Sequence, residues 1–376
     1  MIITKVLLLA AIAGCSLATL PSLSPPPQPV SQNLAEAEPE VVLDRLEHPW
    51  GMAWLPDQSL LITERPGRLR LVRQGKLEPQ PIPGLPPILA LGQGGLLDIA
   101  LHPQFSQNRW LYFTYAHGTP DANRTRVARA KFDGKRLQNL EVIFESPQTK
   151  SGGQHFGSRL LWLPDQTLLV SIGDGGNPPL KLGSDLIRTQ AQNRRSALGK
   201  IVRLQDDGRV PPNNPWRQDV QSLPQLWSYG HRNIQGLAYD AQRKQVWSTE
   251  HGSRGGDELN LIKPGQNYGW PLVTHSEEYF GGQISNLRSA PGKQDPKLVW
   301  QQAIAPSGLA VVNGVIYAGG LVSRDIRRLE LDPQGKIIRQ TSIPIGQRVR
   351  DLKFHQGYLY VLTDSAQGQL LRLPLQ

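Results

Sequence analysis

Short segments in which hydrophobic and polar residues alternate recur along the chain from residue 41 onward, and turn residues separate them. Two of them, residues 51–64 and 159–172, are near copies that share the run Trp-Leu-Pro-Asp-Gln. Looser copies begin at Asp98, Gly236, Gly308 and Asp351. Alternation with a period of two, punctuated by Pro-Asp or Asn-Gly, predicts β-strands joined by tight turns.

The starts of the six copies are 47, 61, 77, 72 and 43 residues apart. A four-stranded unit that repeats every 40 to 50 residues or so, with insertions, is typical of a β-propeller blade. We therefore predict an all-β fold for residues 41–376, a six-bladed β-propeller with four-stranded blades. The irregular spacing leaves a β-sandwich, or two stacked β-domains, as the alternative. Residues 185–197 are the best helix candidate, and we expect them to lie in an insertion.

The first 40 residues have a different pattern. One lysine precedes eight apolar residues, 6–13, and Gly14 and Cys15 follow. This predicts a signal peptide over residues 1–15, because the apolar stretch is shorter than the roughly 20 residues that span a bilayer. The run Ile-Ala-Gly-Cys at 12–15 resembles the bacterial lipoprotein box, in which cleavage before the cysteine leaves it acylated. A plain signal peptide cut near Ala18 is the alternative.

Residues 16–40 are rich in proline and poor in apolar residues, and we interpret them as an extended linker. Either form of processing predicts an exported protein. With Cys15 acylated, it would lie on the periplasmic side of a bacterial membrane, and the lipid anchor would be its only membrane contact.

The amino-acid composition excludes several kinds of site and partner. The 376 residues include a single cysteine, which excludes an internal disulfide framework and any cysteine-cluster metal site. The formal net charge is +10, yet the basic residues are scattered rather than gathered in a run or stripe. We therefore do not expect nucleic-acid binding. A basic surface is compatible with an anionic envelope surface.

Four glycine-rich polar clusters, residues 92–95, 152–157, 230–233 and 250–258, lie near strand boundaries at intervals of about one blade. In a closed ring these loops are expected to converge at the mouth of the central channel. They contain no phosphate-binding loop, and the chain has neither a Gly-x-Ser-x-Gly elbow nor a His-Glu-x-x-His pair.

His155, in the second cluster, is the leading candidate for a general base, because imidazole titrates near neutral pH. Asp174 follows the next predicted strand, so a hairpin would return it to His155 and fix the ring's tautomer. The alternative is a structural histidine, which is how we interpret His48, His102 and His231.

Arginines are the candidates for anion binding, since a planar guanidinium suits bidentate contact with a carboxylate. Arg348 and Arg350 alternate on a predicted strand and should point to one face, while Arg232 lies in the third cluster. A solvated strand edge is the alternative for these arginines. In the fourth cluster Glu250, Asp257 and Glu258 suit a hard cation, although their spacing is not that of an EF-hand.

Together these motifs resemble the soluble aldose sugar dehydrogenases of the glucose/sorbosone dehydrogenase family, quinoproteins that use pyrroloquinoline quinone (PQQ). The segments that support the resemblance are residues 48–57, 92–98, 152–159, 230–236, 250–258, 267–271, 304–308 and 348–351. They follow the family order over roughly residues 44–373. The family fold is a six-bladed propeller, the architecture that the repeat count predicts independently.

The resemblance implies oxidation of an aldose to a lactone. His155 would be the base that takes the proton of the anomeric hydroxyl, with Asp174 as its carboxylate partner, while hydride passes to the quinone. Arg232 would stabilise charge on the quinone, and the implied cofactor-binding residues are Gln93, Arg232, Asn233, Arg348 and Arg350. The electron acceptor stays unidentified.

The resemblance also implies calcium. The backbone carbonyls of Gly252 and Ser253 would bind the ion that polarises the quinone, with Ser253 standing where proline is common. Glu258 and Tyr268 resemble ligands of a second, structural calcium.

One position departs from the family pattern: Val322 stands where a lysine usually binds the cofactor. Losing a charge-assisted contact is expected to weaken binding by about 1.5–3 kcal/mol. Two other functions therefore stay open, a non-catalytic propeller that binds carbohydrate or protein and a calcium-dependent lactonase.

Overall fold

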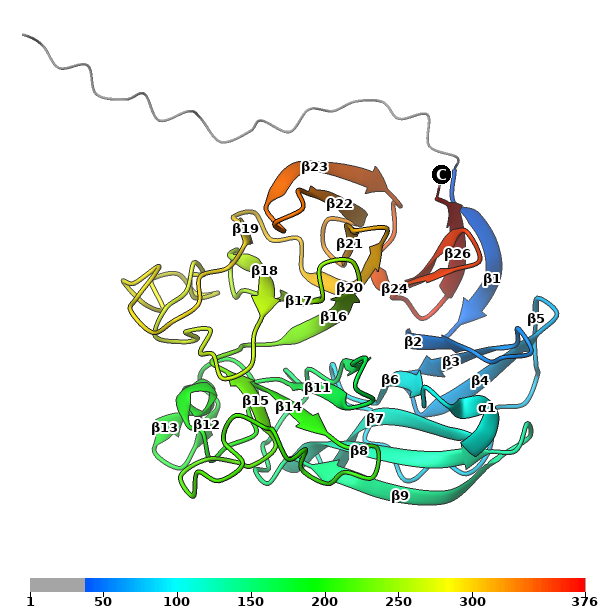
Figure 1. Ribbon diagram of the computed structural model, residues 1–376, viewed down its shortest axis with the longest axis horizontal. Coiled ribbons are helices and arrows are strands. Elements are labelled where there is room, and N and C mark those ends of the chain that lie inside the picture. Colours follow the sequence, from blue (N-terminus) through cyan, green and yellow to red (C-terminus); the bar gives the residue numbers. More distant parts are fainter. Residues whose placement is uncertain (1–37, 376) are drawn as a thin grey trace, which may run out of the picture.

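The computed structural model describes residues 38–375, which form six four-stranded antiparallel sheets arranged in a ring (Figure 1). The predicted signal peptide, Cys15 and most of the predicted linker lie outside these residues. Each sheet is one blade of a β-propeller, so the predicted fold is confirmed and the β-sandwich alternative is wrong.

Blades 1 to 3 follow one another along the chain. Blade 1 consists of β2 (Pro49–Trp54), β3 (Leu60–Glu64), β4 (Arg68–Arg73) and β5 (Lys76–Leu77). Blade 2 consists of β6 (Leu96–Leu101), β7 (Trp110–Thr119), β8 (Ala122–Phe132) and β9 (Leu137–Glu145), with the short helix α1 (Phe105–Asn108) between its first two strands. Blade 3 consists of β10 (Leu160–Trp162), β11 (Leu168–Ile172), β14 (Lys200–Leu204) and β15 (Leu226–Tyr229).

Blades 4 to 6 complete the ring. Blade 4 consists of β16 (Ile234–Asp240), β17 (Gln245–Glu250), β18 (Asp257–Ile262) and β19 (Leu298–Trp300). Blade 5 consists of β20 (Pro306–Val312), β21 (Val315–Gly320), β22 (Asp325–Leu331) and β23 (Ile337–Pro344). Blade 6 consists of β24 (Val349–His355), β25 (Tyr358–Thr363), β26 (Gly368–Pro374) and, from the other end of the chain, β1 (Glu40–Leu46).

The pairing of β1 with β26 closes the ring. Glu40 lies opposite Arg372 and Leu46 lies opposite Gly368 in this antiparallel pair. The propeller thus begins at Glu40, the residue with which the predicted linker was expected to end.

The six sequence copies correspond to the six blades. Each copy begins on, or one residue before, the first strand of its blade, and these first strands face one another around the centre of the ring. Six large hydrophobic clusters fill the spaces between neighbouring blades; for example, Leu61 of blade 1 packs in one cluster with Ile99 and Phe113 of blade 2. Blade-to-blade packing therefore supplies most of the core.

The predicted helix at residues 185–197 is wrong. This segment contains the two-residue strand β13 (Asp185–Leu186), paired with β12 (Lys181–Leu182), and then a 3₁₀ helix, η1 (Ile187–Gln192). The Asn193 side chain accepts a hydrogen bond from the backbone of Arg195, a local turn that competes with helix. The segment lies between β11 and β14, so the prediction that it is an insertion is confirmed.

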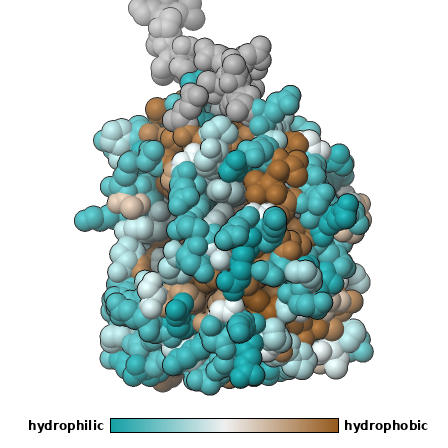
Figure 2. Space-filling model, turned by 90° about the vertical axis from the view of Figure 1, so that its right-hand side faces the viewer, coloured by the Kyte–Doolittle hydropathy of each residue, from teal (hydrophilic) through white to brown (hydrophobic). Residues whose placement is uncertain are grey.

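Hydrophilic side chains cover most of the face shown in Figure 2, and hydrophobic side chains form patches among them. Within residues 38–375, no helix has the length and apolar character needed to cross a bilayer.

Candidate active site

His155 and Asp174 form a buried pair at the open end of the hairpin made by the first two strands of blade 3. The Nδ1 atom of His155 lies 2.6 Å from Oδ1 of Asp174, and only 3 % of the His155 side chain is exposed. His155 precedes β10 and Asp174 follows β11, so the β-hairpin brings them together as predicted. A carboxylate accepts and does not donate, which places the ring proton on Nδ1 and leaves the lone pair on Nε2.

Asp174 is itself held by a side chain from blade 4 and by the backbone of its own loop. The indole Nε1 of Trp270 donates to its second oxygen at 2.7 Å, and the backbone N–H of Gly176 donates to Oδ1 at 3.1 Å. Trp270 lies in the long connection between β18 and β19. Sequence reasoning included it in the segment 267–271 but gave it no role, because a contact across 96 residues has no local signal.

The backbone of His155 is also constrained. Its φ is 47°, in the left-handed region, and its N–H donates to Oε1 of Gln93 at 3.0 Å. Gln93 therefore joins the site through the backbone of His155. Burial and the nearby Arg232 guanidinium lower the pKa of His155 below its ordinary value, which keeps the imidazole neutral at neutral pH.

Arg232 crosses from blade 4 toward this pair. Its Nη1 donates to the carbonyl oxygens of His251 and Gly252, its Nη2 donates to the side chain of Asn177, and its guanidinium lies 5.4 Å from the Trp270 ring centroid. The neighbouring Asn233 accepts a hydrogen bond from the backbone of Gly157. The third glycine-rich cluster thus meets the second, as the propeller prediction required.

Arg348 and Arg350 reach one carboxylate. Arg350 Nη2 lies 2.8 Å and Arg348 Nη2 lies 3.2 Å from Oδ2 of Asp364, so both guanidiniums lie on the same side of the chain, as predicted. Burial alone would raise the pKa of Asp364, but the guanidiniums around it, Arg350 foremost, together outweigh burial and hold it well below its ordinary value. Asp364 and Arg65, a third arginine close to this group, were missed because they lie in blade segments that otherwise look structural.

Several buried donors at this end of the channel have no hydrogen-bond partner among residues 38–375. They are Nε of Arg232, Nδ2 of Asn233 and Nε of Arg350. His251 lies among them, and burial together with Arg232 and Arg350 lowers its pKa to about 3. Unpartnered N–H groups beside cationic side chains fit a planar, oxygen-rich anion, and PQQ carries three carboxylates and two quinone oxygens.

Three of the four predicted calcium residues line one small cavity. Gly252, Glu258 and Tyr268 surround it together with Glu250, and its volume of about 10 Å³ suits one water-sized sphere. Ser253 is next to this group in the chain. Burial and the nearby Glu250 raise the pKa of Glu258 to about 8, which marks a concentration of negative charge. Carboxylate and carbonyl oxygens are the ligands that calcium prefers, so the donor set fits the ion.

Other contacts constrain this cavity. The Tyr268 hydroxyl donates to the carbonyl of Leu261 and accepts from the N–H of Lys263, so its side-chain oxygen is already paired. The Gly252 carbonyl accepts from Arg232 at 2.5 Å, which a cation at this oxygen must displace. Within residues 38–375, no group of three or more His, Cys, Asp or Glu side chains is arranged to hold a metal ion.

The model of the glucose/sorbosone dehydrogenase family matches residues 46–372. The chain belongs to this family. It is 60 % identical over 362 residues to an uncharacterized protein of Synechocystis, covering 92 % of this chain and 88 % of the relative. It is 35 % identical over 354 residues to the aldose sugar dehydrogenase YliI of Escherichia coli K12, covering 89 % of this chain and 92 % of the relative.

Solved structures agree with the family assignment. A glucose dehydrogenase superposes with a TM-score of 0.84 at 37 % identity, covering 90 % of this chain and all of that one. The PQQ-bound form of aldose sugar dehydrogenase from Streptomyces coelicolor superposes with a TM-score of 0.73 at 28 % identity, covering 89 % and 96 %. The chain thus belongs to a family of sugar dehydrogenases of the PQQ-dependent type.

Val322, the departure from the usual family lysine, lies on the surface between β21 and β22, with 57 % of its area exposed. The guanidinium of Arg348 donates to the carbonyl of the preceding residue, Leu321, at 3.3 Å. Position 322 is therefore adjacent to the group of arginines, and Arg348 already supplies a positive charge there.

Proposed function

We propose that this protein oxidises aldose sugars to lactones with PQQ and Ca²⁺ as cofactors. The observation that carries the proposal is the buried His155–Asp174 pair beside the Arg232 guanidinium, at the end of the channel where the unpartnered donors gather. Such a site combines a neutral base with a cationic group in a place that excludes water.

The chemistry follows from the hydrogen bonds of His155. Because Nδ1 is bonded to Asp174, Nε2 is the atom that takes the proton from the sugar's anomeric hydroxyl. Asp174 stabilises the imidazolium that forms, and Trp270 keeps the carboxylate in place. When bound, PQQ supplies the hydride acceptor and Ca²⁺ supplies a Lewis acid that polarises the quinone carbonyl.

The residues that would hold these cofactors are the ones already grouped by the fold. Arg348, Arg350, Arg232 and Asn233 offer donors to the carboxylates and quinone oxygens, with Gln93 beside the base. The backbone carbonyls of Gly252 and Ser253 would bind the calcium that polarises the quinone. Glu258 and Tyr268 would provide ligands to a second, structural calcium. Arg232 then moves from the Gly252 carbonyl to the cofactor.

We further propose that the protein is exported and held at a membrane through an acyl group on Cys15, with an aldose sugar as its substrate. The electron acceptor is a separate partner that restores the oxidised cofactor.

The test is to load the purified protein with PQQ and Ca²⁺ and to measure dye reduction with a panel of aldoses. We expect sugar-dependent reduction, and we expect calorimetry to show saturable PQQ binding. A protein that neither binds PQQ nor reduces the dye is instead the non-catalytic carbohydrate- or protein-binding propeller, for which the exposed Val322 is the supporting observation.

His155→Ala tests the base itself. It should lower kcat by at least about 100-fold, since general-base catalysis contributes that much, and should leave PQQ affinity nearly unchanged. His102→Gln is the matched control, because His102 is also a buried histidine near an aspartate but lies at the far end of β6. Unchanged turnover in His155→Ala would remove this residue from the mechanism.

A further inference from the structure

Six equivalent positions, one from each blade, meet at the centre of the propeller. They are the residues with which the six sequence copies begin: Gly51, Asp98, Arg159, Gly236, Gly308 and Asp351. We call this set the axial ring. Two of its glycines make room for its acids, because a Cβ on Gly51 would lie 2.7 Å from Oδ1 of Asp98, and a Cβ on Gly308 would lie 2.6 Å from Oδ1 of Asp351.

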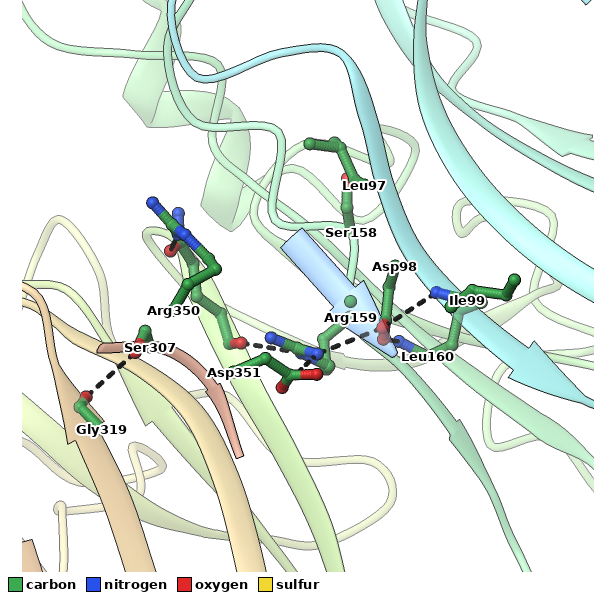
Figure 3. Close-up of polar contacts among 12 residues, drawn as sticks. Leu97, Asp98, Ile99, Ser158, Arg159, Leu160, Ser307, Gly319, Arg350 and Asp351 are labelled. Atoms are coloured by element: carbon green, nitrogen blue, oxygen red, sulfur yellow. Dashed lines mark hydrogen bonds and ion pairs between the residues drawn. The ribbon is translucent and has the colours of Figure 1, made fainter. Parts of the chain in front are cut away.

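Arg159 spans the ring. Its Nη1 lies 3.1 Å from Oδ1 of Asp98 in the neighbouring blade 2 and 2.9 Å from Oδ1 of Asp351 in blade 6, which is opposite blade 3 (Figure 3). The side chain is 2 % exposed, and its guanidinium lies 4.4 Å from the Trp50 ring centroid of blade 1. One side chain thus links four blades at the axis.

The same side chain leads directly to the proposed cofactor site. Arg159 Nε donates to the backbone carbonyl of Gln235 at 2.8 Å, and the side chain of Gln235 accepts from Arg350 Nη1 at 2.7 Å. Arg350 also lies 5.9 Å from the Trp50 ring, and it precedes Asp351 in the chain. Arg350 is therefore fixed through Gln235, Trp50 and Asp351, all of which Arg159 contacts.

Stability alone does not account for this arrangement. Replacing a buried ion pair with packed apolar groups is often neutral or stabilising. The ring places two carboxylates against one guanidinium, and Oδ2 of Asp351 is buried with no hydrogen-bond partner in the described part of the chain. This buried charged cluster costs free energy, so the geometry that it imposes at the axis explains its presence better than stabilisation of the fold does.

We propose that Arg159, held between Asp98 and Asp351, is a positioning residue that sets the place of Arg350 at the cofactor site. This inference rests on the proposed function, since it assigns Arg350 to a cofactor carboxylate. It predicts that a change at the axis alters PQQ affinity without touching the cofactor.

The experiment compares PQQ affinities of the cofactor-free protein and two variants by calorimetry. Arg159→Met should weaken binding about tenfold, as loss of an outer-shell partner commonly does. Asp351→Asn keeps the side chain's shape and should weaken binding in the same direction. A purely electrostatic effect would instead weaken PQQ binding in Arg159→Met and tighten it in Asp351→Asn, because removing a negative charge near an anion tightens its binding. Tighter binding in Asp351→Asn would overturn the proposal.

Arg203→Met is the matched control. Arg203 is also buried, pairs with Asp165 and lies 4.8 Å from the ring centroid of Trp227, but it is on β14, away from the axis. We expect this control to lower stability without weakening PQQ binding. An equal loss of affinity in the control would assign the effect to general destabilisation and contradict the proposal.

A cofactor-free crystal structure of Asp351→Asn keeps this test separate from the proposed function. It should show Arg350 displaced from its 2.7 Å contact with Gln235. If the unmodified protein does not bind PQQ, the proposed function fails, and this displacement still decides the positioning role. If Arg350 keeps this contact with Gln235 in Asp351→Asn, the positioning role is wrong, and this result holds even if Arg159→Met does not fold.

Discussion

Asp174 shows how much of the site depends on one carboxylate. It accepts hydrogen bonds from His155, Trp270 and Gly176. Burial lowers the pKa values of two nearby lysines, Lys150 and Lys200, and the charge of Asp174 offsets part of that lowering. Lys150 Nζ lies 3.9 Å from the Phe156 ring centroid and donates to the carbonyl of Gly152. The protonation of His155 is therefore set by burial and by a balance between this carboxylate and its cationic neighbours.

Lys150→Met should shift the acid limb of the pH–rate profile to higher pH. Burial lowers the pKa of Lys150 to about 7, so it is charged in the more acidic range where His155 titrates, and its charge lowers the pKa of His155. Removing it raises that pKa, and the base is then lost to protonation at a higher pH. The measurement is kcat/KM against pH.

Lys131→Met is the control for this shift, because Lys131 also lies over an aromatic ring, that of Trp110, but is exposed on β8. Its profile should match that of the unmodified protein. An unshifted acid limb in Lys150→Met would contradict the electrostatic role of Lys150.

At the scale of elements, the strands and the loops differ in what the sequence reveals. The blades were predictable because each first strand repeats the same alternation, and His155 and Asp174 were predictable as a pair because one hairpin joins them. Trp270 was not, since its partner Asp174 lies on another blade, 96 residues away in the chain. Asp364 lies in the same blade as Arg350, but no motif in the sequence distinguishes it from a structural residue. The segment near Asn193 failed as a helix because side-chain turns replace backbone helix bonds there.

The connection from β17 to β18 brings two glutamates next to each other. It places Glu250 and Glu258 on facing strands, where they are direct partners in the register and line the same cavity. The pKa of Glu258 is raised to about 8, so the two carboxylates repel each other only above that pH, where both are ionised; a cation in the cavity would remove this repulsion.

Glu258→Gln should therefore have opposite effects on the two forms. Without Ca²⁺, above about pH 9 where Glu258 is ionised, the variant should unfold at a temperature equal to or above that of the unmodified protein, since the repulsion is gone. Ca²⁺ at 100 times its Kd should stabilise the unmodified protein by about 2.7 kcal/mol and should stabilise the variant far less. Scanning calorimetry with and without Ca²⁺ measures both effects.

Glu277→Gln serves as the comparison, because Glu277 is an exposed acid in the nearby β18–β19 connection. It should respond to Ca²⁺ as the unmodified protein does. A full Ca²⁺ response in Glu258→Gln would show that this carboxylate is not a ligand.

For the whole molecule, the decisive feature is that the ring is closed by a strand from each end of the chain. Leu46, at the end of β1, is completely buried in the cluster between blades 6 and 1, together with Met52, Ile62 and Leu370. Within residues 38–375 no other blade pairs strands so far apart in sequence, so we expect this seam to gain its contacts late in folding.

Leu46→Ala should lower the free energy of unfolding by about 2–5 kcal/mol, the range for a buried leucine. The loss should be local as well: hydrogen exchange should accelerate in β1 and β26 more than in β16 to β19. Leu329→Ala, in the cluster between blades 4 and 5, should cost a similar free energy without opening this seam. If hydrogen exchange in Leu46→Ala accelerated equally in all of these strands, the prediction that the seam opens separately would be wrong.

The position of β1 also determines where a pulling force on the residues before Glu40 would act. If the protein is held at a surface through the residues before Glu40, as we propose, any tension on that attachment acts first on β1. Its outermost rung joins Glu40 to Arg372, whose guanidinium holds the carboxylate at 2.7 and 2.9 Å. We expect a pull from this side to separate the residue pairs of β1 and β26 in order, starting at Glu40 and ending at Leu46. The strand that closes the ring is thus also the one on which such tension would act, while the site at the channel mouth lies on other strands.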